Sequence, residues 1–215
     1  ILERQKNKNF EVVFIDSGSN DGSYQFVNEY KSEISIILEK IDKSKFSFGR
    51  SLNMAAEKST YKDILISLSA HCFPINEFWL DTMLSGFSNN SVAIVYGRQV
   101  GEDKTRLSES SHLNSWFGET SKVKSSPFTN NGNAAFRYKT WNIHKFNEIL
   151  TGCEDIEFAK KVLDSKGEIF YSSESIVRHY HDEDYKQIRN RYRRESQALK
   201  AIFNEGINFS LKDIV

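Results

Sequence analysis

The sequence has few cysteines, no excess charge of either sign and no long apolar run. Its two cysteines, Cys72 and Cys153, lack a C-x-x-C spacing, which excludes a disulfide scaffold and favours a reducing cytoplasm. Lys plus Arg and Asp plus Glu both number 29, so a general nucleic-acid binder, which needs a basic excess, is not expected. No segment approaches the roughly 18 apolar residues of a membrane span, and no signal peptide opens the sequence. We therefore expect a cytoplasmic globular protein.

Several familiar ligand loops are also missing. There is no G-x-G-x-x-G pattern and no P-loop, and the segment that begins at Asp16 cannot be an EF-hand loop because its sixth position is Asp21 rather than glycine. A nucleotide or metal site must therefore use other residues.

Apolar stretches of strand length alternate with amphipathic stretches of helical length. Up to residue 100, strands are predicted at 12–15, 34–38, 63–69 and 92–99, with helices at 23–30, 52–56 and 76–87. Beyond it we expect a helix and loop over 102–126, strands at 133–138, 168–171 and 176–181, and helices at 154–165 and 184–204. This order predicts an α/β fold with βαβ units and a mostly parallel sheet. Without repeats or linkers, residues 1–215 are expected to form a single domain.

The stretch VVFIDSGSNDGSYQF, residues 12–26, ends an apolar strand in an aspartate. The strand is predicted to be buried on both faces, and Gly18 and Gly22 supply the turn after Asp16. Ser23 is expected to cap the helix that follows. Ligands bind at the carboxyl ends of strands in open α/β sheets, so Asp16 is a candidate ligand contact. A turn rich in Asx and glycine residues explains the stretch equally well.

Histidines follow two other predicted strands. His71 lies in SAHCFP after the strand at 63–69, while His179 and His181 are two residues apart and would share one face of a strand. Imidazole suits Mn, Zn and other transition ions, although Mn and Mg also require oxygen ligands such as a diphosphate. H-x-H is a common pattern, and a lone histidine is more often structural than a ligand.

Two carboxylates begin the helix GCEDIEFAKKVL. Glu154 and Asp155 would stabilise the helix N-terminus through its free N–H groups and its dipole. The same field is expected to keep Asp155 ionised at neutral pH, as a general base requires. The structural and the catalytic interpretation predict the same local arrangement.

Taken in order, seven segments resemble family 2 glycosyltransferases with the GT-A fold: DSGSNDGS, FSFGRSLNMAAEKS, ILISLSAHCFP, YGRQ, NNGNAAFR, CEDIEFAKKVLDSKG and VRHYH. The resemblance spans about residues 10–182. It implies a Rossmann-type mixed, mostly parallel sheet flanked by helices. It further implies a nucleotide-binding half at 10–100, an acceptor and catalytic half at 101–182, and a C-terminal helix and tail at 183–215. The family's first βα unit is absent, so we expect the chain to be truncated at its N-terminus.

The resemblance also implies roles for individual residues on the donor side. Asp16 matches the aspartate that hydrogen-bonds the base of the donor, typically uracil, and Arg50 with Asn53 matches a segment near the diphosphate. Asn131, Gly132 and Asn133 match a loop that lines the donor sugar and the acceptor. The donor-binding set that it implies is Asp16, Ser17, Ser19, Arg50, Asn53, Ser69 and Asn133.

On the catalytic side, Asp155 matches the base of inverting members, with Glu154 orienting the acceptor or the helix start. Ser69 and His71 stand where the family's D-x-D motif usually lies, which removes negative charge from the metal site. A divalent ion, Mn²⁺ or Mg²⁺, would then depend on His71, His179 and His181 and on the donor diphosphate. Transfer without a metal, with arginine and histidine neutralising the diphosphate, stays open.

The function that the resemblance implies is inverting transfer of a sugar from a nucleotide sugar, with a UDP-sugar favoured. The acceptor would be a hydroxyl of a saccharide or lipid-linked saccharide in bacterial surface polysaccharide synthesis. The protein would act in the cytoplasm, or at the inner face of the cell membrane. A nucleotidyltransferase or sugar-nucleotide binder on a similar fold, and a non-catalytic carbohydrate-binding relative, are alternatives.

The last predicted helix lies outside these segments and is strongly basic. Its apolar stripe is predicted to be Tyr185, Ile188, Tyr192, Leu199 and Ile202. Its basic residues are Lys186, Arg189, Arg191, Arg193 and Arg194. They form either a solvated face or a surface for phosphate, belonging to the donor or to an anionic membrane.

Overall fold

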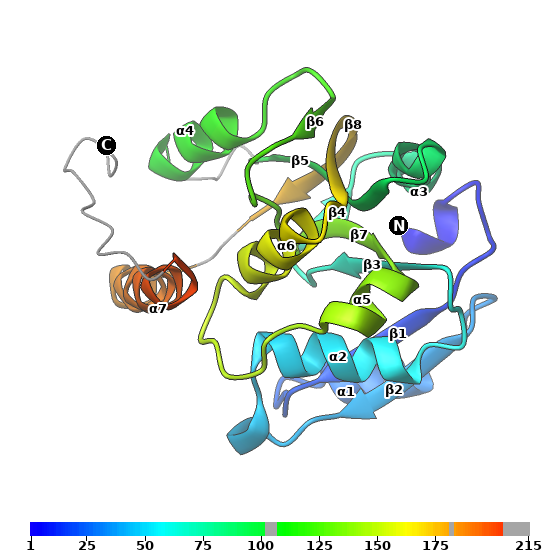
Figure 1. Cartoon of the computed structure of the whole chain (residues 1–215). Coiled ribbons are helices and arrows are strands. Elements are labelled where there is room, and N and C mark those ends of the chain that lie inside the picture. Colours follow the sequence, from blue (N-terminus) through cyan, green and yellow to red (C-terminus); the bar gives the residue numbers. More distant parts are fainter. Residues whose placement is uncertain (102–106, 181–182, 204–215) are drawn as a thin grey trace.

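The computed structural model describes residues 1–101, 107–180 and 183–203. In these ranges β1 (Val12–Asp16) pairs in parallel with β2 (Ile36–Lys40) to form a two-stranded sheet. A six-stranded sheet has the order β3 (Ile64–Leu68), β7 (Asn133–Arg137), β5 (Val92–Val100), β8 (Glu168–His179) and β4 (Cys72–Pro74), with β6 (Lys122–Lys124) also paired to β8. Figure 1 shows both sheets and the helices around them.

The strand directions make the sheet mixed. β5 and β8 are parallel, and β7 runs antiparallel to both β3 and β5, so β3, β5 and β8 share one direction. β4 and β6 run antiparallel to β8. The predicted α/β class, with a sheet flanked by helices and a C-terminal helical extension, is confirmed.

Helices cover both faces of the larger sheet (Figure 1). The helices of the described residues are α1 (Ser23–Glu29), α2 (Phe48–Lys58), α3 (Trp79–Ser85), α4 (Leu107–Trp116), α5 (Tyr138–His144), α6 (Glu154–Asp164) and α7 (Tyr185–Phe203), with 3-10 turns at Leu2–Arg4, Lys43–Lys45 and Gly86–Ser88. The side chains of β7 show how the faces divide: Ala134 and Phe136 pack toward α2, α5 and α6, whereas Ala135 packs toward α3. Alternate strand residues therefore fill two separate cores.

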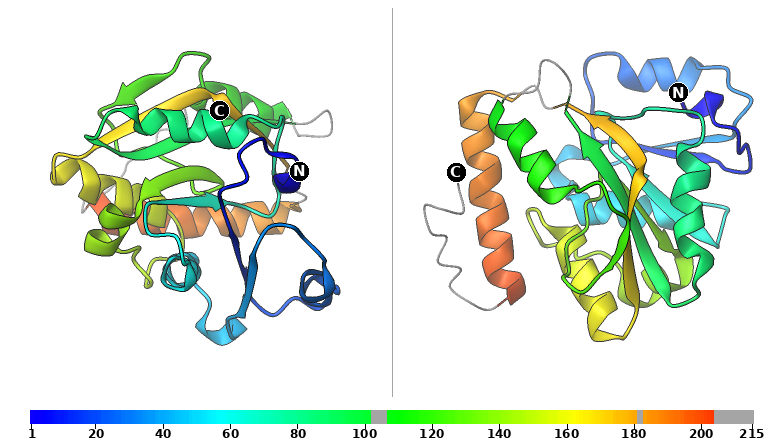
Figure 2. Two further views of the ribbon diagram at one scale, coloured as in Figure 1. Left: turned by 90° about the vertical axis from the view of Figure 1, so that its right-hand side faces the viewer. Right: turned by 90° about the horizontal axis from the view of Figure 1, so that it is seen from above.

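Helix α7 lies apart from the sheet, on the opposite side of the molecule from α3 (Figure 2). Among its described residues only Ala198 is buried. In the described ranges, no helix combines the length and apolarity needed to cross a bilayer.

Several predicted details are wrong. β1 is half-buried rather than buried on both faces, because it belongs to the two-stranded sheet. The strands predicted at 168–171 and 176–181 are one strand, β8, with an irregular register opposite Gly97 and Arg98. Ser23 is the first helical residue of α1 rather than its cap, a position held by Gly22 with a φ of 89°. Helix α3 ends at Ser85, earlier than predicted.

Candidate active site

Three of the polar segments predicted to bind ligands meet at one edge of the larger sheet. Leu68 at the end of β3 pairs with Asn133 at the start of β7, and Cys72 pairs with His179 at the end of β8. The Ser69 backbone N–H donates to Gly132 O at 3.3 Å. Because β7 runs opposite to its neighbours, its first residues join the carboxyl ends of β3, β5 and β8. The edge therefore combines the SAH segment, the NNGN loop and the histidine strand.

Asp16 ends β1 and is only 3% exposed. Its carboxylate accepts hydrogen bonds from the backbone N–H groups of Gly18 at 3.0 Å and Ser19 at 3.2 Å. Hydrogen bonding from the Ser19 side chain and from these N–H groups lowers the pKa of Asp16. The Asx turn expected as the structural explanation is present. Asp16 is held as a carboxylate, whose oxygens retain capacity for a further donor. Ser17 is half-buried and Ser19 exposed beside it.

Arg50 and Glu148 form an ion pair at the start of α2. Arg50 Nε lies 2.9 Å from Glu148 Oε2, and Arg50 Nη1 donates to the Lys45 carbonyl at 2.6 Å. Ser47 Oγ caps the helix by accepting from the Arg50 backbone N–H at 3.2 Å. The Arg50 side chain is still 42% exposed. Its contact with a diphosphate stays a prediction that this geometry permits.

Asn53 has a structural role rather than the predicted ligand contact. Its Nδ2 donates to Phe146 O at 3.0 Å and to Glu148 Oε1 at 3.0 Å. Its Oδ1 accepts from Trp141 Nε1 at 2.9 Å and from the Phe146 backbone N–H at 3.0 Å. Both donors and both acceptor positions of the amide are thus in use. Asn53 fastens α2 to the segment that follows α5.

Asn133 was predicted to contact the donor, and the structure places its side chain in the interior. The residue is 0% exposed. Its Nδ2 donates to Ser175 O at 2.9 Å and Arg98 O at 3.2 Å, and its Oδ1 accepts from Trp79 Nε1 at 3.0 Å. A Cβ on Gly97 would collide with this amide, so glycine leaves the room that Asn133 occupies. Asn133 joins three strands beneath the site.

The neighbouring Asn131 connects the NNGN loop to both carboxylates of α6. Its backbone N–H donates to Asp155 Oδ2 at 3.2 Å, and its Nδ2 donates to Glu154 Oε1 at 3.1 Å. Asp155 Oδ1 also accepts from the Ile156 backbone N–H at 2.8 Å. The two carboxylates that the sequence placed at a helix start are therefore turned toward the sheet edge.

The expected ionisation of Asp155 is contradicted. Burial, together with the adjacent Glu154 carboxylate, raises the pKa of Asp155 to about 8. Burial also raises the pKa of Glu154. The helix dipole and the N–H donors favour the charged form, but they are outweighed by desolvation and like charge. A carboxyl group whose pKa lies near the working pH is well matched to taking up a proton.

His71 and His179 stack at the ends of neighbouring strands. Their ring centroids are 4.9 Å apart with an interplanar angle of 19°. Cys72 adds a third donor, and the possible ligand atoms of the three residues lie within 4.8 Å of one another. Desolvation lowers the pKa of His71, although the negative charge of Glu183 opposes this shift. The lowered pKa favours the neutral imidazole, which is the form that metals bind. His181 lies outside the described residues.

This cluster offers nitrogen and sulfur ligands rather than carboxylate oxygens. Burial raises the pKa of the Cys72 thiol to about 12, so the thiol stays protonated and is a poor ligand. The two imidazoles fit Zn²⁺ or Mn²⁺ better than Mg²⁺, which prefers oxygen ligands. Ser69 is half-buried nearby. Diphosphate oxygens would have to complete the coordination of Mn²⁺.

Two polar contacts at the sheet edge were not predicted. Gln99 is 1% exposed, and its Nε2 donates to Asn130 Oδ1 at 2.7 Å. The same oxygen accepts from the Gly132 backbone N–H at 2.8 Å. A Cβ on Gly132 would lie 2.8 Å from Asn130 Oδ1 and 3.2 Å from Cys72 Sγ. In the sequence, the only hint of these contacts is that the YGRQ and NNGN segments each contain both a glycine and a side-chain amide.

Helix α7 packs against the start of α6. Thr151 Oγ1 donates to Arg194 O at 3.4 Å, and Cys153 Sγ donates to Glu195 O at 3.9 Å. Arg191 Nη2 lies 2.8 Å from Glu183 Oε2, and Arg191 Nη1 lies 3.8 Å from Glu195 Oε1. Arg191 was predicted to lie in a solvated face or a surface for phosphate, yet its ion-paired side chain is only 25% exposed. The i, i+4 spacing of Arg191 and Glu195 in the sequence could have predicted their ion pair.

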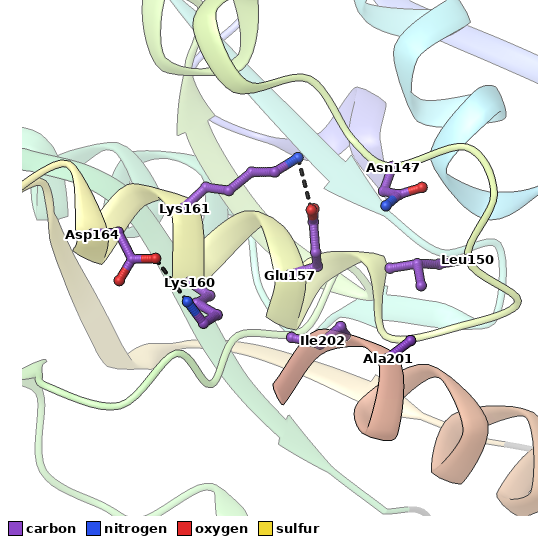
Figure 3. A pocket seen from close by; sticks show the side chains of 8 residues that line it. All are labelled: Asn147, Leu150, Glu157, Lys160, Lys161, Asp164, Ala201 and Ile202. Carbon is purple, nitrogen blue, oxygen red and sulfur yellow. Dashed lines mark hydrogen bonds and ion pairs between the residues drawn. The ribbon is translucent and has the colours of Figure 1, made fainter. Parts of the chain in front are cut away.

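A separate hollow of about 260 Å³ lies between α6, the segment after α5 and the C-terminal end of α7 (Figure 3). It is lined by Asn147, Leu150, Glu157, Lys160, Lys161, Asp164, Ala201 and Ile202. Two ion pairs bound it, Lys161–Glu157 and Lys160–Asp164, each at 2.8 Å (Figure 3). None of the predicted site residues lines this hollow, so we place the chemistry at the sheet edge instead.

Comparison with known families agrees with this arrangement of strand ends. Residues 1–150 match the sequence model described as Glycosyl transferase family 2. The chain belongs to glycosyl transferase family 2. The predicted identification as a glycosyltransferase of this family is confirmed, and the match covers the sheet edge up to the segment before α6.

Two curated relatives of this family 2 chain are named as O-antigen chain rhamnosyltransferases. WbaN of Salmonella anatum is 26% identical in an alignment of 202 residues that covers 89% of this chain and 63% of WbaN. RfbN of Salmonella typhimurium is 26% identical in an alignment of 193 residues that covers 85% of this chain and 60% of RfbN. The chain thus spans about three fifths of the length of these relatives.

Solved glycosyltransferases share the fold. The mannosyltransferase PcManGT from Pyrobaculum calidifontis, in complex with GDP-Man and Mn²⁺, superposes with a TM-score of 0.71 at 18% identity over 96% of this chain and 58% of its own. S. aureus TarS 1-349, in complex with UDP-GlcNAc, superposes with a TM-score of 0.69 at 16% identity over 96% of this chain and 62% of its own. These similarities establish the GT-A architecture.

Proposed function

We propose that this chain carries an inverting sugar transfer from a nucleotide-sugar donor to a saccharide hydroxyl in bacterial surface polysaccharide synthesis. The observation that carries the proposal is the carboxylate pair of Glu154 and Asp155, which Asn131 holds at the sheet edge in a family 2 fold. The names of the two O-antigen relatives support a polysaccharide product. A UDP-sugar is the favoured donor, and the TarS complex with UDP-GlcNAc supports that choice.

Asp155 acts as the general base in this proposal. The acceptor oxygen attacks the anomeric carbon from the face opposite the nucleotide, and its proton passes to Asp155. The bond from the anomeric carbon to the diphosphate oxygen breaks, and the nucleoside diphosphate leaves with the electron pair. Attack from the opposite face inverts the anomeric centre. Glu154, bonded to the Asn131 amide, positions the loop that lies between the acceptor and the sheet.

On the donor side, Asp16, Ser17 and Ser19 are proposed to hold the base, with Arg50 reaching the diphosphate. His71 and His179, together with His181, would hold a divalent ion at the end of β8. When bound, the ion would stabilise the negative charge that develops on the leaving diphosphate. The neutral imidazole favoured at His71 suits this role. Asn53 and Asn133 are left out of the donor contacts because their amides are committed elsewhere.

The acceptor that we propose is a saccharide, either free or attached to a lipid. A lipid-linked acceptor would place the protein at the inner face of the cell membrane. A non-catalytic carbohydrate-binding relative is the second candidate, favoured by the absence of carboxylates from the SAH segment. A binding module would have no use for a proton-accepting carboxylate at Asp155, which separates the two candidates.

The test is a thermal-shift screen against UDP, GDP, dTDP and CMP, each with and without Mn²⁺. We expect one nucleotide to stabilise the protein and the shift to grow with metal. The matching nucleotide sugar is then supplied with saccharide acceptors, and the anomeric configuration of the product is read by NMR. A product that retains the donor's configuration would refute the inverting mechanism, and nucleotide binding without any transfer would favour the binding module.

A further inference from the structure

The outward face of α7 carries a continuous row of cations. Lys186, Arg193 and Lys200 follow one another at seven-residue spacing, and Arg189 lies three residues after Lys186. Residues at these spacings share one face of a helix. All four side chains are exposed. We call this set, Lys186, Arg189, Arg193 and Lys200, the basic stripe.

Burial on the opposite side of α7 indicates that the basic stripe faces outward. The Arg191 side chain, which pairs with Glu183 and Glu195, is 25% exposed, and Ala198 is 3% exposed. Arg191, Glu195 and Ala198 lie on one helical face, roughly half a turn away from Arg193. The ion-paired residues of the helix are therefore partly covered, whereas the basic stripe is exposed to solvent.

No acidic side chain balances the basic stripe within α7 itself. In Tyr185–Phe203 the only acidic residue is Glu195, which lies on the covered face beside Arg191. The whole chain has a formal net charge of zero, so the stripe concentrates positive charge locally. A row of like charges on one face repels itself unless an anionic partner or solvent screens it.

Tyrosines border the basic stripe. Tyr185 is 84% exposed and Tyr192 is 47% exposed, although both were predicted to belong to the apolar stripe of this helix. By helical geometry, both lie between the basic stripe and the half-buried Ile188 and Leu199. A tyrosine ring suits a boundary where one side is apolar and the other is wet, and it is enriched at membrane interfaces.

We propose that the basic stripe of α7 docks on an anionic membrane surface. Each Lys or Arg near such a surface strengthens binding, and bordering tyrosines can enter the headgroup region. The opposite face of the same helix touches the segment before Glu154 through Thr151 and Cys153. One helix diameter, about 10–12 Å, would then separate the membrane from the catalytic carboxylates. The inference rests on the proposed lipid-linked acceptor.

Vesicle flotation of the full chain, without donor or acceptor, tests the docking. The vesicles contain either phosphatidylcholine alone or equal parts of phosphatidylcholine and phosphatidylglycerol. We expect flotation only with the anionic vesicles, weakening as salt is raised. Replacing the basic stripe by glutamine (K186Q, R189Q, R193Q and K200Q) should lower the partition coefficient by about 10²-fold or more, at roughly fivefold for each cation.

The matched control removes four exposed lysines from other elements: K31Q, K122Q, K139Q and K166Q. It changes the net charge equally and should keep the binding. Equal loss in both variants, or absence of flotation of the wild type at low salt, would overturn the membrane assignment. Flotation contains no sugar and therefore tests the docking separately from transfer. Vesicle binding by a protein that shows no transfer in a separate assay would contradict the transferase proposal alone. Transfer to a soluble acceptor by a protein that does not bind vesicles would contradict only the docking.

Discussion

The backbone N–H of Asn131 donates to the carboxylate of Asp155 at 3.2 Å, which fixes the start of α6 against the loop that precedes β7. The same residue's amide holds Glu154 at 3.1 Å. One asparagine therefore orients both carboxylates toward the carboxyl ends of β3, β5 and β8. The orientation of a general base matters as much as its pKa, because proton transfer requires hydrogen-bonding distance to the acceptor hydroxyl.

The first prediction concerns Asp155 as the base. Asp155→Asn should lower sugar transfer by about 10²-fold or more and leave donor affinity nearly unchanged, because an amide cannot accept the proton. Steady-state transfer and nucleotide titration measure the two quantities. Asp164→Asn, an exposed position at the other end of α6, is the matched control. Wild-type turnover in the Asp155 variant would remove this residue from the mechanism.

The second prediction follows from the raised pKa of Asp155. A carboxyl group whose pKa rises from about 4 in the unfolded chain to about 8 in the folded protein loses stabilising free energy as pH rises between the two values. Asp155→Asn should therefore melt at a higher temperature than the wild type above pH of about 8, by roughly 2–4 °C for each kcal/mol gained. The two melting curves should converge toward pH 4. A difference that does not depend on pH would contradict the raised pKa.

The third prediction concerns the histidine cluster. His179→Ala and His71→Ala should weaken UDP binding in the presence of Mn²⁺ or Zn²⁺ by about tenfold or more. The reason is that loss of a residue that only supports a metal ligand already lowers metal affinity about tenfold, and loss of a ligand should cost at least as much. Binding without metal should change little. Titration calorimetry with and without metal makes the comparison, and His144→Ala on α5 serves as the control. Equal losses with and without metal would count against a ligand role.

The fourth prediction concerns Asn53, whose amide makes four hydrogen bonds in the interior. Asn53→Ala should lower the free energy of unfolding by about 3 kcal/mol, because buried groups of Trp141 and Phe146 lose their partners. Chemical denaturation measures the change. Asn90→Ala, at an exposed position, should be nearly neutral. A small effect at Asn53, together with weaker donor binding, would restore the ligand role that the structure argues against.

The predictions that succeeded were those that depend on local sequence. The strands at β3 and β5 and the helix at α6 were found from the spacing of apolar residues, since a buried face imposes that spacing directly. The ordered motifs identified the family, because several of them combine a strand end with the polar residues that follow it. Asp16 and His71 could be placed at strand ends for the same reason.

Contacts between distant segments decided the rest. Asn53 and Asn133 look like ligand residues in the sequence, yet Trp141 and Trp79, each more than fifty positions away, take up their amides. The local field at the start of α6 predicted an ionised Asp155, whereas burial and Glu154 raise its pKa. The spacing of apolar residues was enough to find most of the strands and helices, and their order along the chain. Tertiary structure alone decided which polar groups are covered, because desolvation depends on what packs against them.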